Sequence, residues 1–120
     1  MKNKTLVLGA SENPGRYSNR AIRALLQKNH EVIAIGKQKG EVNGVDIQTE
    51  MSTDQKIDTV TLYINPNHQK QYEDSLIALK PNRVIFNPGT ENPEFQNKLQ
   101  KAGIETLNAC SLVLLATDQY

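Results

Sequence analysis

Near its start the chain reads Leu6-Val7-Leu8-Gly9-Ala10-Ser11-Glu12-Asn13-Pro14-Gly15-Arg16. A short apolar run stops at a glycine, a loop of small and turn-forming residues follows, and an amphipathic segment begins at Ser18. This order predicts a strand, a loop and the start of a helix. The unpaired N–H groups of such a helix start, together with the helix dipole, favour an anion. We therefore expect the loop to hold the phosphates of a nucleotide-like ligand.

Strand and helix signals alternate along the rest of the chain. Short β-branched and apolar runs predict strands at 5–8, 31–35, 59–64, 83–86 and 104–107. Apolar residues at helical spacing predict three helices: from an N-cap at Ser18 to about Asn29, from about His68 to Leu79, and from Pro93, after an N-cap at Asn92, to an inward-facing Ala102. Residues 42–47 suggest one short extended piece, and 52–56 suggest a short helix capped by Ser52.

This alternation predicts the fold class. Strands that alternate with helices indicate an α/β domain with a parallel sheet. The 120 residues suit a single domain, which we place at 1–120. We expect one doubly wound, Rossmann-type parallel sheet with helices on both of its faces.

Composition narrows the class of partner. The net charge of +1 gives no strong field for nucleic acid or a membrane surface. The single cysteine, Cys110, permits no internal disulfide and suits a reducing compartment. The basic start, Met1 to Thr5, precedes an apolar run, Leu6 to Leu8, that is too short for a signal peptide, and Leu112 to Ala116 is too short to span a bilayer. We expect a cytoplasmic protein.

The predicted strand ends collect small and turn-forming residues. In an open doubly wound sheet these ends share one edge, where ligands bind in a crevice. Turn chemistry alone also places glycine, asparagine and proline after strands, so each cluster is either a turn or a ligand contact. The clusters are Gly9, Ala10 and Ser11; Gly36 and Lys37; Asn65 and Pro66; Asn87, Pro88 and Gly89; and Asn108, Ala109 and Cys110.

The first loop matches neither common phosphate-binding motif. Ser11 and Pro14 replace glycines of the dinucleotide fingerprint, and Pro14 also replaces the second glycine of a P-loop. We expect the N–H groups of Ala10, Ser11 and the region of Ser18 to wrap a pyrophosphate. Arg16 would pair with a phosphate in bidentate fashion. A plain strand-to-helix connection is the alternative.

The end of the second strand discriminates between nucleotides. NAD sites usually carry an acidic residue there for the ribose 2′-hydroxyl. Here Gly36 is followed by Lys37, with Lys39 two residues later. Positive charge suits a ribose that bears an extra phosphate, which favours NADP-like or coenzyme A-like ligands. A pair of solvated lysines is the alternative.

Catalytic and metal-binding patterns are weak. His30 and His68 have no partner at metal-ligand spacing, and no nucleophile with its base can be argued from spacing. Cys110 is either a small buried hydrophobe or a partly exposed thiol near the ligand. We therefore predict no catalytic residue and no metal site.

Two segments resemble a known family. Gly9-Ala10-Ser11 with Asn13-Pro14-Gly15-Arg16 and Ser18, and Phe86 to Asn92 with the ending Gly103 to Leu112, resemble the CoA-binding-domain proteins. These are small stand-alone bacterial relatives of the N-terminal domain of the succinyl-CoA synthetase alpha subunit. The similarity covers essentially the whole chain. It departs at Gly36-Lys37, where many relatives carry Asn-Pro-Lys.

The resemblance implies a Rossmann-type fold and a coenzyme A ligand with its phosphates on the first loop. Synthetases of this type also use a second domain with a phosphorylated histidine, so the resemblance supports binding of coenzyme A or an acyl-CoA without ligase chemistry. The alternatives are an NADP-dependent oxidoreductase and an interaction module with a vestigial nucleotide pocket. Residues 112–116 either pack on their own sheet or pair with a second copy, and an unidentified protein partner stays open.

Overall fold

The computed structural model describes residues 4–120, so most of the basic start, Met1 to Asn3, lies outside the described residues. In that part of the chain a single sheet contains β1 (Lys4–Leu8), β2 (Glu31–Ile35), β3 (Gly40–Val42), β4 (Val45–Gln48), β5 (Thr59–Leu62), β6 (Arg83–Phe86) and β7 (Glu105–Asn108). The spatial order is β3-β4-β2-β1-β5-β6-β7, and every neighbouring pair is parallel except β3 with β4. The predicted fold class is confirmed.

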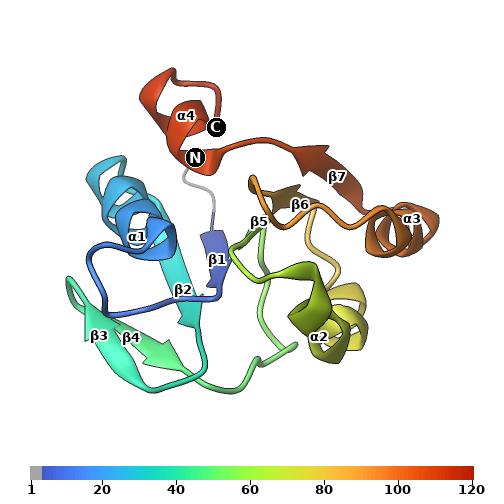
Figure 1. Ribbon diagram of the computed structural model, residues 1–120, viewed down its shortest axis with the longest axis horizontal. Coiled ribbons are helices and arrows are strands. Elements are labelled where there is room, and N and C mark those ends of the chain that lie inside the picture. The colour runs from blue at the N-terminus through green and yellow to red at the C-terminus, as the bar shows by residue number, and fades with distance from the viewer. Residues whose placement is uncertain (1–3) are drawn as a thin grey trace.

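Helices cover both faces of this sheet (Figure 1). The helices are α1 (Tyr17–Gln27), α2 (Pro66–Leu79), α3 (Pro93–Lys101) and α4 (Ser111–Ala116). One buried cluster joins Leu76 of α2 and Phe95 of α3 to the sheet. The other joins Ile22 of α1 and Leu115 of α4 to the opposite face. Because both faces are covered, β1 and β6 contain continuous apolar runs, and even the threonines of β5, which alternate with Val60 and Leu62, are buried.

The strand order reverses beside β1. The chain leaves β1 toward β2 on one side and returns to pair β5 on the other. The connecting helices of a doubly wound sheet diverge at such a point and leave a crevice at the carboxyl ends of the strands. The first loop, 9–16, opens at this position.

Two helix starts differ from the prediction. Helix α1 begins one residue before Ser18, which is buried inside the first turn and does not cap it; Arg16 is the N-cap residue and makes no side-chain cap. Helix α2 begins at Pro66, two residues before His68, because Asn65 caps it by accepting the N–H of Asn67 at 2.8 Å. The predicted Asn-Pro cap at Asn92 is confirmed, since Asn92 caps α3. The equivalent signal at Asn65-Pro66 was missed.

Other local predictions were wrong. The expected single extended piece at 42–47 is an antiparallel hairpin of β3 and β4, turned at Asn43 and Gly44, which both have positive φ. This Asn-Gly pair is the preferred type I′ turn sequence. Residues 52–56 form no helix; the hydroxyl of Ser52 accepts the N–H of Asp54, and its backbone carbonyl accepts from the side chain of Gln55. Ala102 is exposed and follows α3 instead of facing the core.

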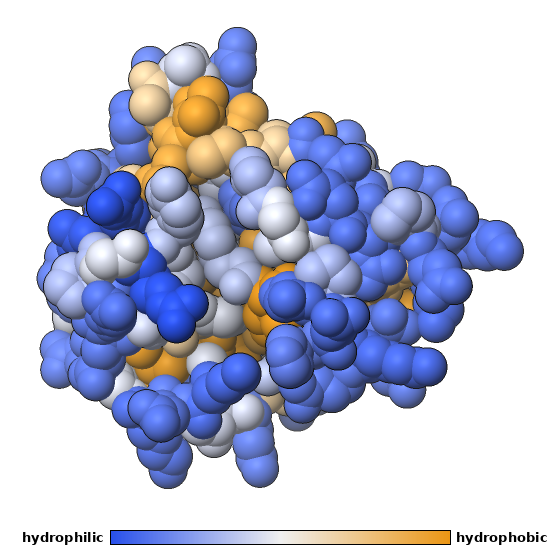
Figure 2. Space-filling view, in the orientation of Figure 1, coloured by the Kyte–Doolittle hydropathy of each residue, from blue (hydrophilic) through white to orange (hydrophobic). Residues whose placement is uncertain are grey.

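The apolar segment near the end of the chain forms α4 and packs on its own sheet through the buried Leu115. Val113 of the same helix is 56% exposed. Figure 2 shows an apolar patch over α4 at the top of the view. Among residues 4–120, none of the helices is long and apolar enough to cross a membrane.

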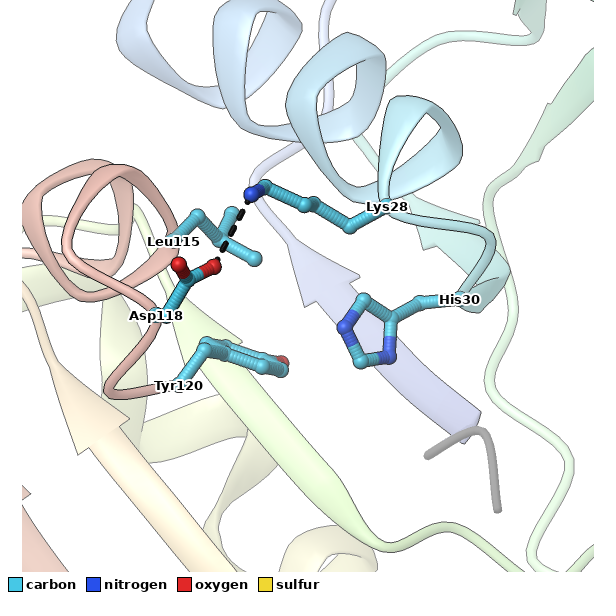
Figure 3. A pocket seen from close by; sticks show the side chains of 5 residues that line it. All are labelled: Lys28, His30, Leu115, Asp118 and Tyr120. Atoms are coloured by element: carbon cyan, nitrogen blue, oxygen red, sulfur yellow. Dashed lines mark hydrogen bonds and ion pairs between the residues drawn. The ribbon is translucent and has the colours of Figure 1, made fainter.

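The segment after α4 returns to the amino-terminal edge of the sheet (Figure 3). Lys28 and Asp118 form an ion pair of 3.0 Å there, and the rings of His30 and Tyr120 meet edge to face at 5.1 Å. The hydroxyl of Tyr120 shares a hydrogen bond of 2.6 Å with that of the buried Thr5. These contacts leave a hollow of about 140 Å³, which lies at the edge opposite the crevice.

Candidate functional site

A crevice of about 770 Å³ lies at the carboxyl ends of β1, β2, β5 and β6. Its volume is in the range of roughly 300–1,000 Å³ that is usual for small-molecule sites. The first loop and the start of α1 form one wall, and residues 36–39 continue that wall beyond β2. Residues 63–72 and 88–90 form the other wall. The crevice is therefore at the point where the strand order reverses.

The backbone at the floor of the crevice is tightly confined. Gly9 has a φ of +98°, and a Cβ on it would lie 2.9 Å from the carbonyl oxygen of Tyr63. The N–H groups of Gly9 and Ala10 both donate to the carbonyl of Ile35, at 2.8 and 2.9 Å. The Ala10 N–H that we expected to bind a phosphate is thus already occupied, because it joins the loop to the end of β2.

Side chains hold the first loop against α1. The Nδ2 of Asn19 donates to the carbonyl of Ser11 at 2.9 Å, and its Oδ1 accepts from the Nε of Arg23 at 2.8 Å. Arg23 also donates to the carbonyl of Pro14. Arg23 therefore braces the loop, whereas Arg20 is exposed. The N–H groups of the first turn of α1 have no acceptor one turn earlier in the helix, and that turn lines the crevice at Tyr17 and Ser18.

Charged and neutral lining residues are separated along the crevice. Arg16, Lys37 and Lys39 line the wall formed by the first loop and residues 36–39, together with the carboxylate of Glu12. Among residues 4–120, those that line the opposite wall, which we call the neutral wall, carry no carboxylate, ammonium or guanidinium group: they are Tyr63, Ile64, Asn65, His68, Gln71, Tyr72, Pro88, Gly89 and Thr90. A ligand with anionic groups at one end and an uncharged arm at the other fits this division.

A comparison with known protein families agrees with this geometry. The family model described as a CoA binding domain matches residues 3–116. The chain belongs to the CoA-binding domain family. The family resemblance that the first loop and residues 86–92 indicated is therefore confirmed.

Solved structures share this CoA-binding domain fold. A crystal structure described as an uncharacterized protein is 44% identical, with a TM-score of 0.97, over 100% of this chain and 99% of that one. A Thermus thermophilus protein is 23% identical, with a TM-score of 0.85, over 99% and 91%. An acetyl-coenzyme A synthetase of Candidatus Korarchaeum cryptofilum is 18% identical, with a TM-score of 0.72, over 89% of this chain and 25% of its own. The last two show the fold alone. No curated protein matches the chain.

Most residues singled out in the sequence line the crevice of this CoA-binding domain. They are Gly9, Ala10, Ser11, Asn13, Arg16, Ser18, Lys37, Asn65, Pro88 and Gly89. Six others do not line it: Pro14 is exposed, Pro66 forms the first turn of α2, and the remaining four lie away from the lining, namely Asn87, Asn108, Ala109 and Cys110. Among residues 4–120 there is no cluster of histidine, cysteine and acidic residues that could hold a metal ion.

Asn87 is buried in a polar junction. Its Nδ2 donates to the Oγ1 of Thr61 at 2.7 Å and to the carbonyl of Leu62 at 2.8 Å. Its Oδ1 accepts the N–H of Ser111 at 2.8 Å. The backbone carbonyl of Asn87 accepts both the N–H and the hydroxyl of Thr90. Asn87 therefore joins the ends of β5 and β6 to the start of α4.

Several lining residues were missed because they lie within helices or inside the predicted strand 59–64, whereas β5 ends at Leu62. His68, Gln71 and Tyr72 share one face of α2, at spacings of three and four residues. Starting the predicted helix at Pro66, as the Asn65-Pro66 signal indicates, would have placed these three residues on one helix face beside a strand end. Tyr63 also lines the crevice, and its side chain packs against the buried cluster below α1 and α4, where its hydroxyl has no hydrogen-bond partner among residues 4–120. Burial raises the pKa of Tyr63 to about 12.

Proposed function

We propose that this chain binds coenzyme A, or an acyl derivative of it, in the crevice at the carboxyl ends of the strands. The observation that carries the proposal is the separation of charged and neutral lining residues in a member of the CoA-binding domain family. Coenzyme A has the matching layout, with phosphates on its nucleotide end and an uncharged pantetheine arm.

The charged wall suits the phosphates. The pyrophosphate would lie at the first turn of α1, where unpaired N–H groups and the helix dipole favour anions and where Arg16 lines the crevice. The phosphate on the adenosine ribose would lie near Lys37, with help from Lys39. A lysine at the end of β2 favours a phosphorylated ribose over the unmodified ribose of NAD.

The neutral wall suits the pantetheine arm. Asn65 and Gln71 bring side-chain amides to this lining, and Ile64 and Tyr72 bring apolar side chains. An arm that alternates amide groups with methylene groups needs both kinds of contact. In this proposal the thiol end of the ligand points toward α2 and residues 88–90.

The proposal assigns binding and no ligase chemistry to this chain. Pure protein incubated with radiolabelled ATP or GTP, succinate and coenzyme A is expected to yield neither phosphoprotein nor thioester. Robust product formation would contradict this part of the proposal.

Calorimetric titration with coenzyme A, dephospho-CoA and NADP tests the ligand. A charge-assisted contact of Lys37 with the ribose phosphate is worth about 1.5–3 kcal/mol. Wild type should therefore bind coenzyme A roughly tenfold to a hundredfold more tightly than dephospho-CoA. Lys37→Ala should remove most of that ratio, and Lys101→Ala, at the exposed end of α3, should leave it unchanged.

Three results would contradict this assignment. Equal affinity for coenzyme A and dephospho-CoA would remove Lys37 from the site. Tighter binding of NADP would favour the oxidoreductase alternative. Failure of every nucleotide to bind would favour an interaction module with a vestigial pocket.

A further inference from the structure

Glu12 reaches from the first loop to the edge of the sheet. Its Oε2 accepts a hydrogen bond from the backbone N–H of Glu41 at 2.9 Å. Glu41 belongs to β3, the outermost strand on that side, so an amide of β3 that points away from β4 has no neighbouring strand to receive it. The carboxylate of Glu12 takes the place of that missing strand at one position.

The glycine beside Glu41 makes room for this contact. A Cβ built on Gly40 would lie 2.4 Å from the Cδ of Glu12, 2.6 Å from its Cγ and 2.8 Å from its Oε1. Gly40 is not among the glycines with positive φ, so its backbone conformation is open to other residues. A side chain at position 40 would therefore displace the flexible side chain of Glu12 from this contact, because Glu12 occupies the volume that it would need.

The contact fixes one end of a short turn in the crevice wall. Lys37, Gln38 and Lys39 line the crevice between Gly36 and Gly40. At the first end, the N–H of Gly36 donates to the carbonyl of Gln48 at 2.9 Å, and a Cβ there would lie 2.4 Å from the carbonyl oxygen of Ala10. At the second end, Glu12 holds the hairpin. A short segment between two anchored ends loses little further freedom when a ligand binds.

We propose that Glu12 is a positioning residue for anion binding: by holding the amide of Glu41, it fixes the Lys37–Lys39 turn as a wall of the crevice. The inference rests on the proposed function, since the turn matters only to an anionic ligand. The carboxylate of Glu12 also lines the crevice, where its negative charge opposes the same ligand. Glu12 thus has two opposite effects, which two substitutions separate.

Glu12→Gln and Glu12→Ala form a matched pair. Both remove the charge, but glutamine keeps an oxygen that can accept from Glu41, and alanine does not. Hydrogen exchange measured by NMR, without any ligand, should show the Glu41 amide protected in wild type and in Glu12→Gln. In Glu12→Ala we expect this amide to exchange roughly tenfold faster. Equal exchange rates of the Glu41 amide in the two variants would show that Glu12 does not hold this amide, regardless of the affinity for coenzyme A.

Affinity for coenzyme A tests the consequence for the ligand. Because both variants lack the charge, the difference between them measures positioning. Glu12→Ala should bind coenzyme A roughly three- to tenfold more weakly than Glu12→Gln. Equal affinities with different exchange would overturn the positioning role and leave the proposed function intact. A wild-type chain that binds no coenzyme A would overturn both, and the ligand-free exchange result distinguishes that failure from failure of the anchor.

A double substitution tests the packing independently. Gly40→Ala should make the Glu41 amide exchange faster, because its Cβ displaces the side chain of Glu12 from its contact. Adding Glu12→Ala should then change that exchange little, since the contact is already lost. A double variant whose Glu41 amide exchanges much faster than that of Gly40→Ala would contradict the assigned packing.

Discussion

Asn87 donates a hydrogen bond to the hydroxyl of Thr61 at 2.7 Å, from the end of β6 to the middle of β5. Both side chains are buried, and Ser111 at the start of α4 bonds to each of them. In a position where a ligand contact was expected, the chain thus has a polar junction that joins three elements. The junction keeps the walls of the crevice in place without lining it.

Asn87→Ala should therefore act mainly on stability. The substitution leaves the carbonyl of Leu62 and the N–H of Ser111 without the side chain that bonds them, while the hydroxyl of Thr61 keeps only its bond to Ser111. Since an unsatisfied buried polar group costs about 1–3 kcal/mol, we expect the free energy of unfolding to fall by about 2–4 kcal/mol in urea titrations. Asn108→Ala, at an exposed strand end, should change it by less than about 0.5 kcal/mol. A stable Asn87→Ala variant that had lost coenzyme A binding would make Asn87 a ligand contact instead.

Much of the fold could be predicted because its signals are local. Strands 31–35 and 83–86 have the predicted bounds, and Asn92-Pro93 starts α3 as its sequence indicates. The hairpin was missed although Asn43-Gly44 is a strong turn signal, because the flanking strands are very short. Local patterns also mark where strands end, which is why the first loop and Lys37 were recognised as parts of one edge.

The burial of the Asn87 side chain could not be predicted from local sequence patterns. Asn65-Pro66 and Asn87-Pro88 look alike as strand ends, but the first caps a helix and the second is held by groups of β5 and α4. Such partners are distant in sequence and become neighbours only when the sheet forms. The same holds for Glu12 and Glu41, and for the tyrosines of the neutral wall.

Gly36→Ala should disturb the crevice itself. The added Cβ would lie 2.4 Å from the carbonyl oxygen of Ala10 and 3.0 Å from Ile47, and a backbone oxygen cannot move aside cheaply. We expect a loss of about 1–3 kcal/mol in the free energy of unfolding. Gly15→Ala is the matched control, because its Cβ would meet only the Oδ1 of Asn13 at 3.3 Å. Equal stability of the two variants would argue against this close approach of the first loop to β2.

Tyr63 should make the protein sensitive to alkaline pH. Burial raises its pKa from 10.0 to about 12, so between these values the unfolded chain releases the proton while the folded chain keeps it. Stability contributed by the neutral hydroxyl is present below pH 10 and is lost as pH rises, by at most about 1.4 kcal/mol per pH unit. Burial also raises the pKa of Tyr120, which contributes in the same direction.

Tyr63→Phe should consequently weaken the alkaline dependence without abolishing it. At neutral pH the variant should be at least as stable as wild type, because it removes a buried hydroxyl that lacks a hydrogen-bond partner among residues 4–120. Urea titrations between pH 8 and about 11 measure both effects. Tyr17→Phe, at a tyrosine that is 65% exposed, is the control. An unchanged pH slope in Tyr63→Phe would show that the hydroxyl is not buried in solution.

The central claim is that coenzyme A binds at the carboxyl edge of the sheet, and a titration followed by the backbone amide resonances of the protein tests it most directly. Binding should shift the amides of the first loop and α1 start, of Lys37, and of Gly89 on the neutral wall. The amides of Lys28, His30 and Tyr120, at the opposite edge, should stay in place. Unchanged spectra at millimolar coenzyme A, or shifts gathered around Lys28, His30 and Tyr120, would contradict the account.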